Sequence, residues 1–104
     1  MEMKNSLINL NKDKIKLLCK SYKVKSLYSF GSINTSAFNE LSDIDLLVEI
    51  DSDDPLDYSD NYFELKFDLE KMFNRSIDLL ENKTLKNKYL KENIDSSKVL
   101  IYGK

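Results

Sequence analysis

The chain has 104 residues, a formal net charge of −2, a single cysteine and no histidine. This length allows one domain that buries about 65% of its unfolded surface, and we expect residues 1–104 to form it without separate catalytic and substrate-binding lobes. The scattered lysines and arginines argue against autonomous binding to a long nucleic acid, which requires a clustered basic face.

The sequence also carries no sign of export or membrane insertion. No segment approaches the roughly 18 continuous apolar residues of a membrane span, and residues 1–5 lack the apolar core of a signal peptide. The lone Cys19 excludes an internal disulfide, and with no histidine as its base it is better explained as a small buried apolar residue than as a nucleophile. We therefore expect a cytoplasmic protein.

The first predicted elements are a helix over residues 7–22 and a strand over residues 24–30. Apolar side chains recur at three- and four-residue steps in the helix, and the strand places Val24, Ser26, Tyr28 and Phe30 on a common period of two. The strand ends at Gly31, where a missing Cβ lets a ligand approach the backbone. A short helical turn opening at Ser32 would present free N–H groups to an anion such as phosphate.

Ten residues after Gly31-Ser32, a second predicted strand opens with Asp43-Ile44-Asp45. Alternate strand residues point to the same face, so the two carboxylates converge on one small volume while Ile44 and Leu46 point into the core. Two like charges held close together repel each other unless a proton or a cation lies between them. A hard divalent cation such as Mg²⁺ suits carboxylate oxygens and often bridges protein to phosphate.

The second half of the chain reads as a helix, a strand and a helical tail. An acidic loop leads into the helix, predicted over residues 58–73, in which we expect most of the aromatics Tyr62, Phe63 and Phe67 to be core. Residues 76–81 predict a third strand that carries Asp78. Residues 84–102 predict helix with a break near residues 95–97, where Ser or Asp would cap a final short helix. If the strand of Asp78 neighbours that of Asp43 and Asp45, three carboxylates meet, which is the ligand supply of a two-metal phosphoryl-transfer site.

The three carboxylates and the Gly-Ser turn together resemble a known signature. Gly31-Ser32, ten intervening residues, Asp43-Ile44-Asp45 and the later Asp78 are similar to the minimal nucleotidyltransferases of the DNA-polymerase-β-like superfamily. The stretches 27–32, 38–48 and 60–63 resemble a compact bacterial subgroup within it.

The resemblance implies the fold, the reaction and the partner. The fold would be α/β (α+β), with a small mixed sheet of about three strands flanked by helices. Members of the subgroup are commonly paired with a HEPN-domain partner, often a toxin ribonuclease, which they silence by transferring AMP from ATP onto a tyrosine. By this resemblance Gly31 and Ser32 would hold the triphosphate, Asp43 and Asp45 would bind two Mg²⁺ ions, and Asp78 would complete the site and help activate the acceptor hydroxyl.

Two hypotheses about function remain open at this point. The first is an enzyme, an Mg²⁺-dependent nucleotidyltransferase that modifies a partner protein as the antitoxin of a toxin–antitoxin pair. The second is a binding module that neutralises the partner by contact, because residues 33–37 lack the arginines and the glycine that many relatives carry after Gly-Ser. Lys66 and Arg75 are the residues that would supply positive charge from elsewhere. The sequence does not define the base specificity, the number of nucleotides transferred or the oligomeric state.

Overall fold

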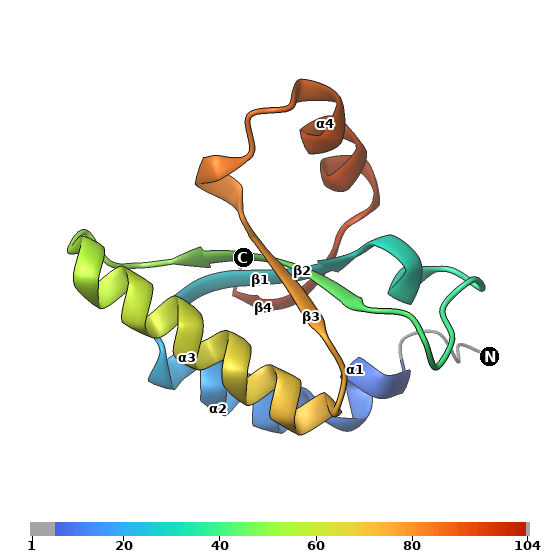
Figure 1. Cartoon of the computed structure of the whole chain (residues 1–104), viewed down its shortest axis with the longest axis horizontal. Helices are drawn as coiled ribbons and strands as arrows, with labels where there is room; N and C mark the ends of the chain where they lie inside the picture. The colour runs from blue at the N-terminus through green and yellow to red at the C-terminus, as the bar shows by residue number, and fades with distance from the viewer. Residues whose placement is uncertain (1–5, 104) are drawn as a thin grey trace.

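The computed structural model describes residues 6–103. Within this range four strands form one mixed sheet in the order β3-β2-β1-β4, where the resemblance implied about three strands (Figure 1). In chain order the elements are α1 (Ser6–Leu10), α2 (Lys12–Ser21), β1 (Val24–Phe30), the 3-10 turn η1 (Gly31–Asn34), β2 (Ile44–Ile50), α3 (Pro55–Phe73), β3 (Ile77–Glu81), the 3-10 turn η2 (Asn82–Thr84), α4 (Lys88–Ser97) and β4 (Val99–Gly103).

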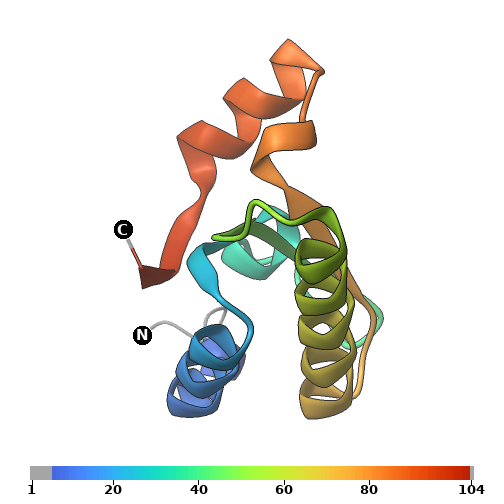
Figure 2. The same ribbon diagram turned by 90° about the vertical axis from the view of Figure 1, so that its left-hand side faces the viewer.

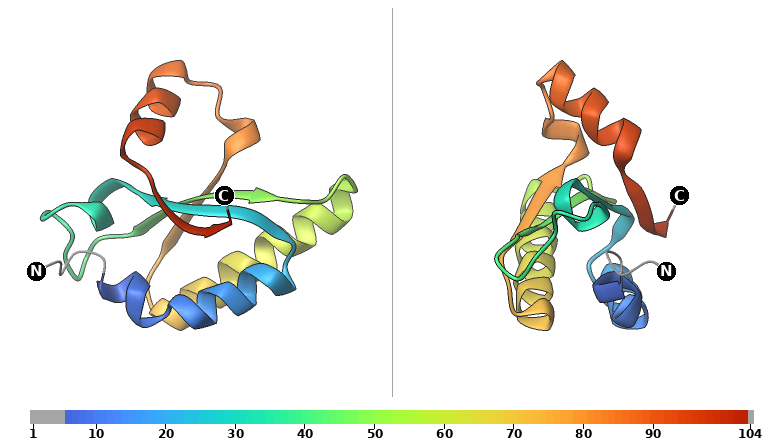
Figure 3. Two further views of the ribbon diagram at one scale, coloured as in Figure 1. Left: turned by 180° about the vertical axis from the view of Figure 1, so that it is seen from behind. Right: turned by 90° about the vertical axis from the view of Figure 1, so that its right-hand side faces the viewer.

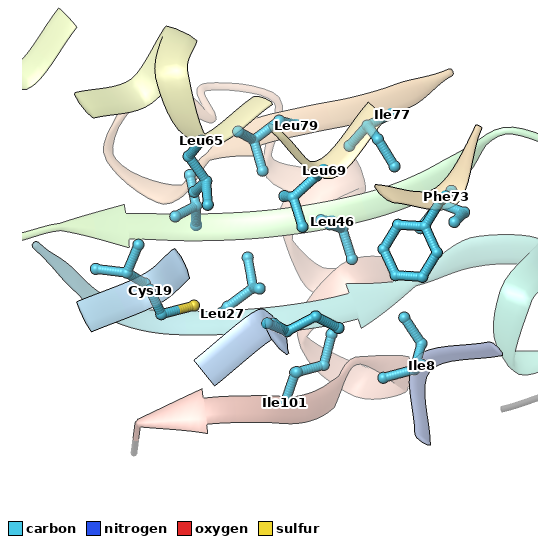
Figure 4. Packing of buried hydrophobic residues seen from close by; sticks show 14 of the residues in the cluster. Ile8, Cys19, Leu27, Leu46, Leu65, Leu69, Phe73, Ile77, Leu79 and Ile101 are labelled. Carbon is cyan, nitrogen blue, oxygen red and sulfur yellow. The ribbon is translucent and has the colours of Figure 1, made fainter. Parts of the chain in front are cut away.

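The sheet lies between two layers of helix. Helices α2 and α3 lie side by side under one face, and α4 stands over the other (Figures 2 and 3). The main core fills the space between the sheet and α2 and α3, where side chains from all three meet (Figure 4). Ile44 and Leu46 of β2 are buried in this core, as the alternation in the sequence predicts. A smaller cluster of Phe30, Leu47 and Ile94 joins the opposite face to α4.

The pairing of the central strands decides which residues become neighbours. Strand β2 runs antiparallel to β1 and parallel to β3. In this register Phe30 lies opposite Asp45 on one side, and Asp78 lies opposite Asp45 on the other. The end of β1, the start of β2 and the start of β3 therefore share one row across the sheet.

The predicted first helix is wrong in one respect, because it is two helices that meet at Asn11. The side-chain amide of Asn11 donates to Leu7 O at 2.9 Å, and its backbone N–H donates to Ile8 O at 3.1 Å. Asparagine competes in this way for backbone acceptors and interrupts a helix. The inward side chains remain in place, since Ile15 and Cys19 are buried on α2.

Helix α3 begins three residues earlier than the predicted residue 58. Asp54 caps it by accepting a hydrogen bond from Leu56 N–H at 3.0 Å, and Pro55 occupies the first turn, where a missing N–H costs nothing. Leu65 and Leu69 are fully buried. The aromatic expectation fails for Phe63 and Phe67, which lie on the outer face of α3 and are 58% and 67% exposed.

The predicted helical tail is also wrong, because its last part is the edge strand β4. Helix α4 ends at Ser97, whose hydroxyl donates to Asn93 O at 2.9 Å. The β-branched and aromatic run that follows then pairs antiparallel with the free edge of β1. Ile101 enters the main core through this pairing. Between residues 6 and 103 no helix combines the length and the apolar character needed to cross a membrane.

Candidate functional site

The Gly-Ser turn lies directly against a carboxylate of β2. Gly31 has φ +75, and a Cβ built on it would collide with Oδ2 of Asp45 and lie 3.3 Å from its Cγ. Position 31 therefore requires glycine for two reasons: the left-handed backbone conformation and the close approach of the Asp45 carboxylate. The antiparallel pairing explains the contact, because Phe30 opposite Asp45 leaves Gly31 beside the Asp45 side chain.

The three predicted acids gather at one end of the β2–β3 pair. Asp45 and Asp78 are register partners on parallel strands, and Asp43 lies two residues before Asp45, just ahead of β2. Asp45 is half-buried, whereas Asp43 and Asp78 are exposed. Because Asp45 alternates with the buried Ile44 and Leu46, it faces the side of the sheet on which α4 stands.

Electrostatic repulsion marks this cluster as a place for a cation. Burial raises the pKa of the Asp45 carboxyl, and the negative charges of Asp78 and Asp43 raise it further. The ion pairs found between residues 6 and 103 join other groups, and none of them includes Asp43, Asp45 or Asp78. The cluster thus has negative charge that the described part of the chain does not neutralise.

The donor set fits Mg²⁺ in its chemistry, although the side chains are not gathered around one point. In the described chain no group of three Asp, Glu, His or Cys side chains lies close enough to hold a metal ion as it stands. Carboxylate oxygens are nevertheless the ligands that Mg²⁺ prefers, and Mg²⁺ takes only one or two from protein when phosphate supplies others. Asp43 and Asp78 are exposed, so rotation of their side chains is not blocked by packing.

The neutral residues after Gly31-Ser32 stabilise the turn itself. The Asn34 amide donates to Ser29 O at 3.1 Å and accepts from the Ser29 hydroxyl at 3.3 Å. The Thr35 hydroxyl donates to Ser32 O at 2.9 Å and accepts from Ala37 N–H at 3.1 Å. These two side chains are therefore engaged with the backbone of their own loop.

Helix α3 braces the strand that carries Asp78. The Tyr62 hydroxyl donates to Leu79 O at 2.5 Å, and a carboxylate oxygen of Glu70 accepts from Ile77 N–H at 3.3 Å. The two contacts flank Asp78 along β3. Burial raises the pKa of the Tyr62 hydroxyl, and the negative charges of Glu81 and Asp78 raise it further. Lys66 lies on α3 between Tyr62 and Glu70, one helical turn from each.

Neither brace is predictable from the sequence, and the expectation for Arg75 was only that it supplies positive charge. Tyr62 reads as an ordinary core residue because its spacing fits the buried face of α3. Arg75 reads as an exposed cation, yet its guanidinium donates to Asn39 O and Ser42 O in the loop before Asp43. The acid at position 70, seven residues before Ile77, gives no local signal either. The packing of α3 against β3 reveals the first and third of these roles, and the approach of the loop before Asp43 to Arg75 reveals the second.

Comparison with known families identifies the class of protein to which this fold belongs. The family model for Polymerase beta, Nucleotidyltransferase matches residues 13–104, which is most of the chain. The chain belongs to this nucleotidyltransferase family.

Relatives in Methanocaldococcus jannaschii are similar over most of the chain. Two of them, each named "Putative protein adenylyltransferase", are 40% identical over 87 residues and 39% identical over 88 residues. Each alignment covers 84% of this chain and 84% of the relative.

Solved structures of minimal nucleotidyltransferases and of toxin–antitoxin complexes share the fold. A structure of a minimal nucleotidyltransferase matches with a TM-score of 0.74 and 22% identity, covering 90% of this chain and 92% of that one. A chain of a toxin–antitoxin crystal structure with AMP-PNP matches with a TM-score of 0.69 and 24% identity, covering 90% and 74%. A chain from the complex of tri-AMPylated Shewanella oneidensis HEPN toxin with MNT antitoxin matches with a TM-score of 0.63 and 23% identity, covering 92% and 72%. The expected fold class and the expected membership of the polymerase-β-like nucleotidyltransferases are confirmed.

Proposed function

We propose that this chain transfers AMP from ATP to a hydroxyl group of a partner protein. The observation that carries the proposal is the contact of Gly31 with the Asp45 carboxylate, with Asp78 in register beside it. This contact places the Gly31-Ser32 turn, whose backbone suits phosphate, directly beside the acidic cluster, whose negative charge the described chain does not neutralise. A triphosphate chelated to Mg²⁺ is the ligand whose charge and oxygen atoms complement both parts.

Each residue of the cluster then has a role in the transfer. Gly31 and Ser32 hold the β- and γ-phosphates through the turn, and Asp43, Asp45 and Asp78 would hold two Mg²⁺ ions. When bound, these ions neutralise charge on the triphosphate and lower the pKa of the acceptor hydroxyl. The acceptor oxygen forms a bond to the α-phosphorus, and the bond from that phosphorus to the bridging oxygen breaks and releases pyrophosphate. Asp78 takes the proton of the acceptor hydroxyl.

A HEPN-domain protein is the partner that we propose. The relatives carry the name of protein adenylyltransferases, and one structural neighbour is a complex that contains an AMPylated HEPN toxin. Both support a protein acceptor over a nucleic acid, as does the net charge of −2. We propose that the reaction takes place in the cytoplasm, where ATP and Mg²⁺ are available.

Intact mass spectrometry of the partner tests the proposal. A HEPN protein from the same genome is incubated with this chain, ATP and Mg²⁺, and we expect it to gain the mass of one AMP for each modified hydroxyl. The double variant Asp43→Asn/Asp45→Asn should abolish the gain. Asp51→Asn/Asp53→Asn is the matched control, because it makes the same charge change at two exposed acids with the same spacing. No adduct with the wild-type chain, or an adduct that survives in the Asp43/Asp45 variant, contradicts the proposal.

Thermal unfolding gives a second test that does not require the partner. A ligand at a hundredfold over its dissociation constant stabilises the folded state by about 2.7 kcal/mol. For a domain of this size that corresponds to a rise in melting temperature of roughly 10 °C or more. ATP with Mg²⁺ should produce this rise, and ATP with EDTA should produce far less.

Neutralisation by contact alone is the second candidate function. It is favoured by one observation, namely that Asn34 and Thr35 are engaged within the turn and no cation follows Gly31-Ser32 up to residue 42. A phosphate held there meets neutral donors, which interact less strongly than an arginine does. If the Asp43→Asn/Asp45→Asn variant still protects cells from the partner, contact explains the protection; if protection is lost while the variant stays folded, transfer does.

A further inference from the structure

The loop that delivers Asp43 to the cluster is organised around a tight turn at residues 39–42. Ser42 N–H donates to Asn39 O at 3.1 Å and Leu41 N–H donates to the Asn39 side-chain oxygen at 2.8 Å. Asn39 N–H donates in turn to the Ser42 hydroxyl at 3.0 Å. Leu41 at the tip is 94% exposed, so apolar packing does not hold this turn in place.

One side chain from the loop between α3 and β3 attaches this turn to the start of β3. Arg75 Nη1 donates to Asn39 O at 3.1 Å and to Ser42 O at 2.8 Å, so it binds both ends of the turn. Its guanidinium carbon lies 4.7 Å from the centre of the Phe38 ring, which itself packs against the main core. A guanidinium combines directed donors with stacking on an aromatic ring in a way that an ammonium does not.

A backbone hydrogen bond continues this attachment on the other side of Asp43. Ile44 N–H donates to Ser76 O at 3.1 Å. The peptide groups before and after Asp43 are therefore held by two consecutive residues, Arg75 through its side chain and Ser76 through its carbonyl. Asp78 follows two residues later on the same strand. The position of Asp43 relative to Asp78 is thus set by a segment of four residues.

We propose that Arg75 is a positioning residue that fixes Asp43 for metal binding, rather than a cation that contacts the triphosphate. The inference rests on the proposed function and deepens it. Both of its hydrogen bonds in the described chain go to carbonyl oxygens of the turn at residues 39–42, so its donors at Nη1 are engaged there and not at the Gly31-Ser32 turn. Residues that orient a metal ligand typically change metal affinity about 10- to 100-fold when they are altered.

The variants Arg75→Lys and Arg75→Gln separate position from charge. Lysine retains the charge and loses the planar fork of the guanidinium. A positioning role therefore predicts that both variants weaken Mn²⁺ binding about tenfold or more. Electron paramagnetic resonance without nucleotide measures this binding. Binding of ATP in EDTA should not change in either. Phe38→Leu, which removes the ring beneath the guanidinium, should weaken Mn²⁺ binding in the same direction by less. It serves as the second variant if Arg75→Gln does not fold.

Lys71→Gln is the matched control. Lys71 is an exposed cation in the last turn of α3, next to the groove between α2 and α3, and its removal should leave Mn²⁺ binding at the wild-type value. Wild-type Mn²⁺ affinity in Arg75→Lys together with a loss in Arg75→Gln would overturn the proposal, because charge alone would then matter. Weaker ATP binding in EDTA by either variant would also overturn it, since it would place Arg75 on the phosphates.

A readout independent of the metal distinguishes failure of this proposal from failure of the proposed function. Hydrogen exchange of the Asp43 and Ile44 amides should be faster in Arg75→Lys than in the wild type or Lys71→Gln. If the wild-type chain binds no Mn²⁺, the proposed function fails, whereas the exchange rates still decide the role of Arg75. Unchanged exchange in Arg75→Lys would refute the attachment of Asp43 by Arg75.

Discussion

Replacing Gly31 by alanine is the perturbation that most directly probes the contact between the turn and the acidic cluster. Gly31 has φ +75, and a left-handed backbone costs a residue with a Cβ about 1–2 kcal/mol. The new methyl group would also occupy the place of the Asp45 carboxylate, which must rotate away. Gly31→Ala should therefore unfold at a lower temperature and also lose its response to nucleotide.

The size of the effect follows from the backbone cost. For a domain of this length each kcal/mol shifts the melting temperature by about 4–8 °C, so we expect a decrease of roughly 5–15 °C, measured by circular dichroism without ligand. The displaced carboxylate is a side chain and can move, so it should add little to this loss. ATP with Mg²⁺ should then fail to raise the melting temperature of Gly31→Ala.

Gly103→Ala is a control of the same kind at the other end of the sheet. Gly103 has φ +85, and its Cβ would overlap the backbone carbonyl of Lys25, so the substitution should also destabilise the fold. It lies on β4, away from the acids, and should keep the full stabilisation by ATP and Mg²⁺. A normal ligand response in Gly31→Ala, or its loss in Gly103→Ala, would refute the assignment of the turn to the nucleotide.

Three further predictions concern the cluster, the thiol and the last strand. Asp45→Asn should stabilise the metal-free protein at neutral pH. Because the pKa of Asp45 is raised in the folded protein, the contribution of this carboxyl group to stability is fully present below its unfolded-state pKa and is lost as the pH rises through its folded-state pKa. Unfolding by denaturant at a series of pH values should show a weaker loss of stability with rising pH for the variant. An identical profile would contradict the destabilisation of the Asp45 carboxylate by burial and by its acidic neighbours. Burial raises the pKa of Cys19 to about 12, so its thiol should react with a disulfide reagent at neutral pH much more slowly in native protein than in urea. Ile101→Ala should cost about 2–5 kcal/mol in denaturant unfolding if β4 packs as described, whereas a helical tail would make the change nearly neutral.

The sequence predicts the elements whose pattern is local. Strand β1 and the strands of Asp45 and Asp78 follow from short apolar patterns bounded by turn residues, and the observed bounds of β1 and β3 agree with residues 24–30 and 76–81 to within a residue. Strand β2 begins at Ile44, one residue after the predicted start at Asp43. Strand β4 was missed because a short apolar run fits either a helix or a strand, and its partner, the free edge of β1, lies 70 or more residues earlier. The break at Asn11 depends on one side-chain hydrogen bond, which periodicity does not reveal.

The candidate site divides in the same way. Gly31, Asp43, Asp45 and Asp78 can be selected from spacing and residue type, and the structure places them at one end of the sheet, while their roles stay predictions. The role of Arg75 was not predictable, because its acceptors lie 33 and 36 residues away and are backbone carbonyls that any sequence would supply. Contacts of this kind become visible only once the tertiary structure fixes the distance between loop and strand.

The row that joins Phe30, Asp45 and Asp78 also links the site to the accuracy of folding. Side chains alternate between the two faces of a strand, so a slip of β2 by one residue would turn Asp45 into the apolar core between the sheet and helices α2 and α3 and turn Leu46 to the opposite face. A chain that folded with this error would lose the acidic cluster together with its core. Nucleotide binding would therefore also report that β2 has paired in the correct register, because a chain with the wrong register would lack the acids that bind the nucleotide.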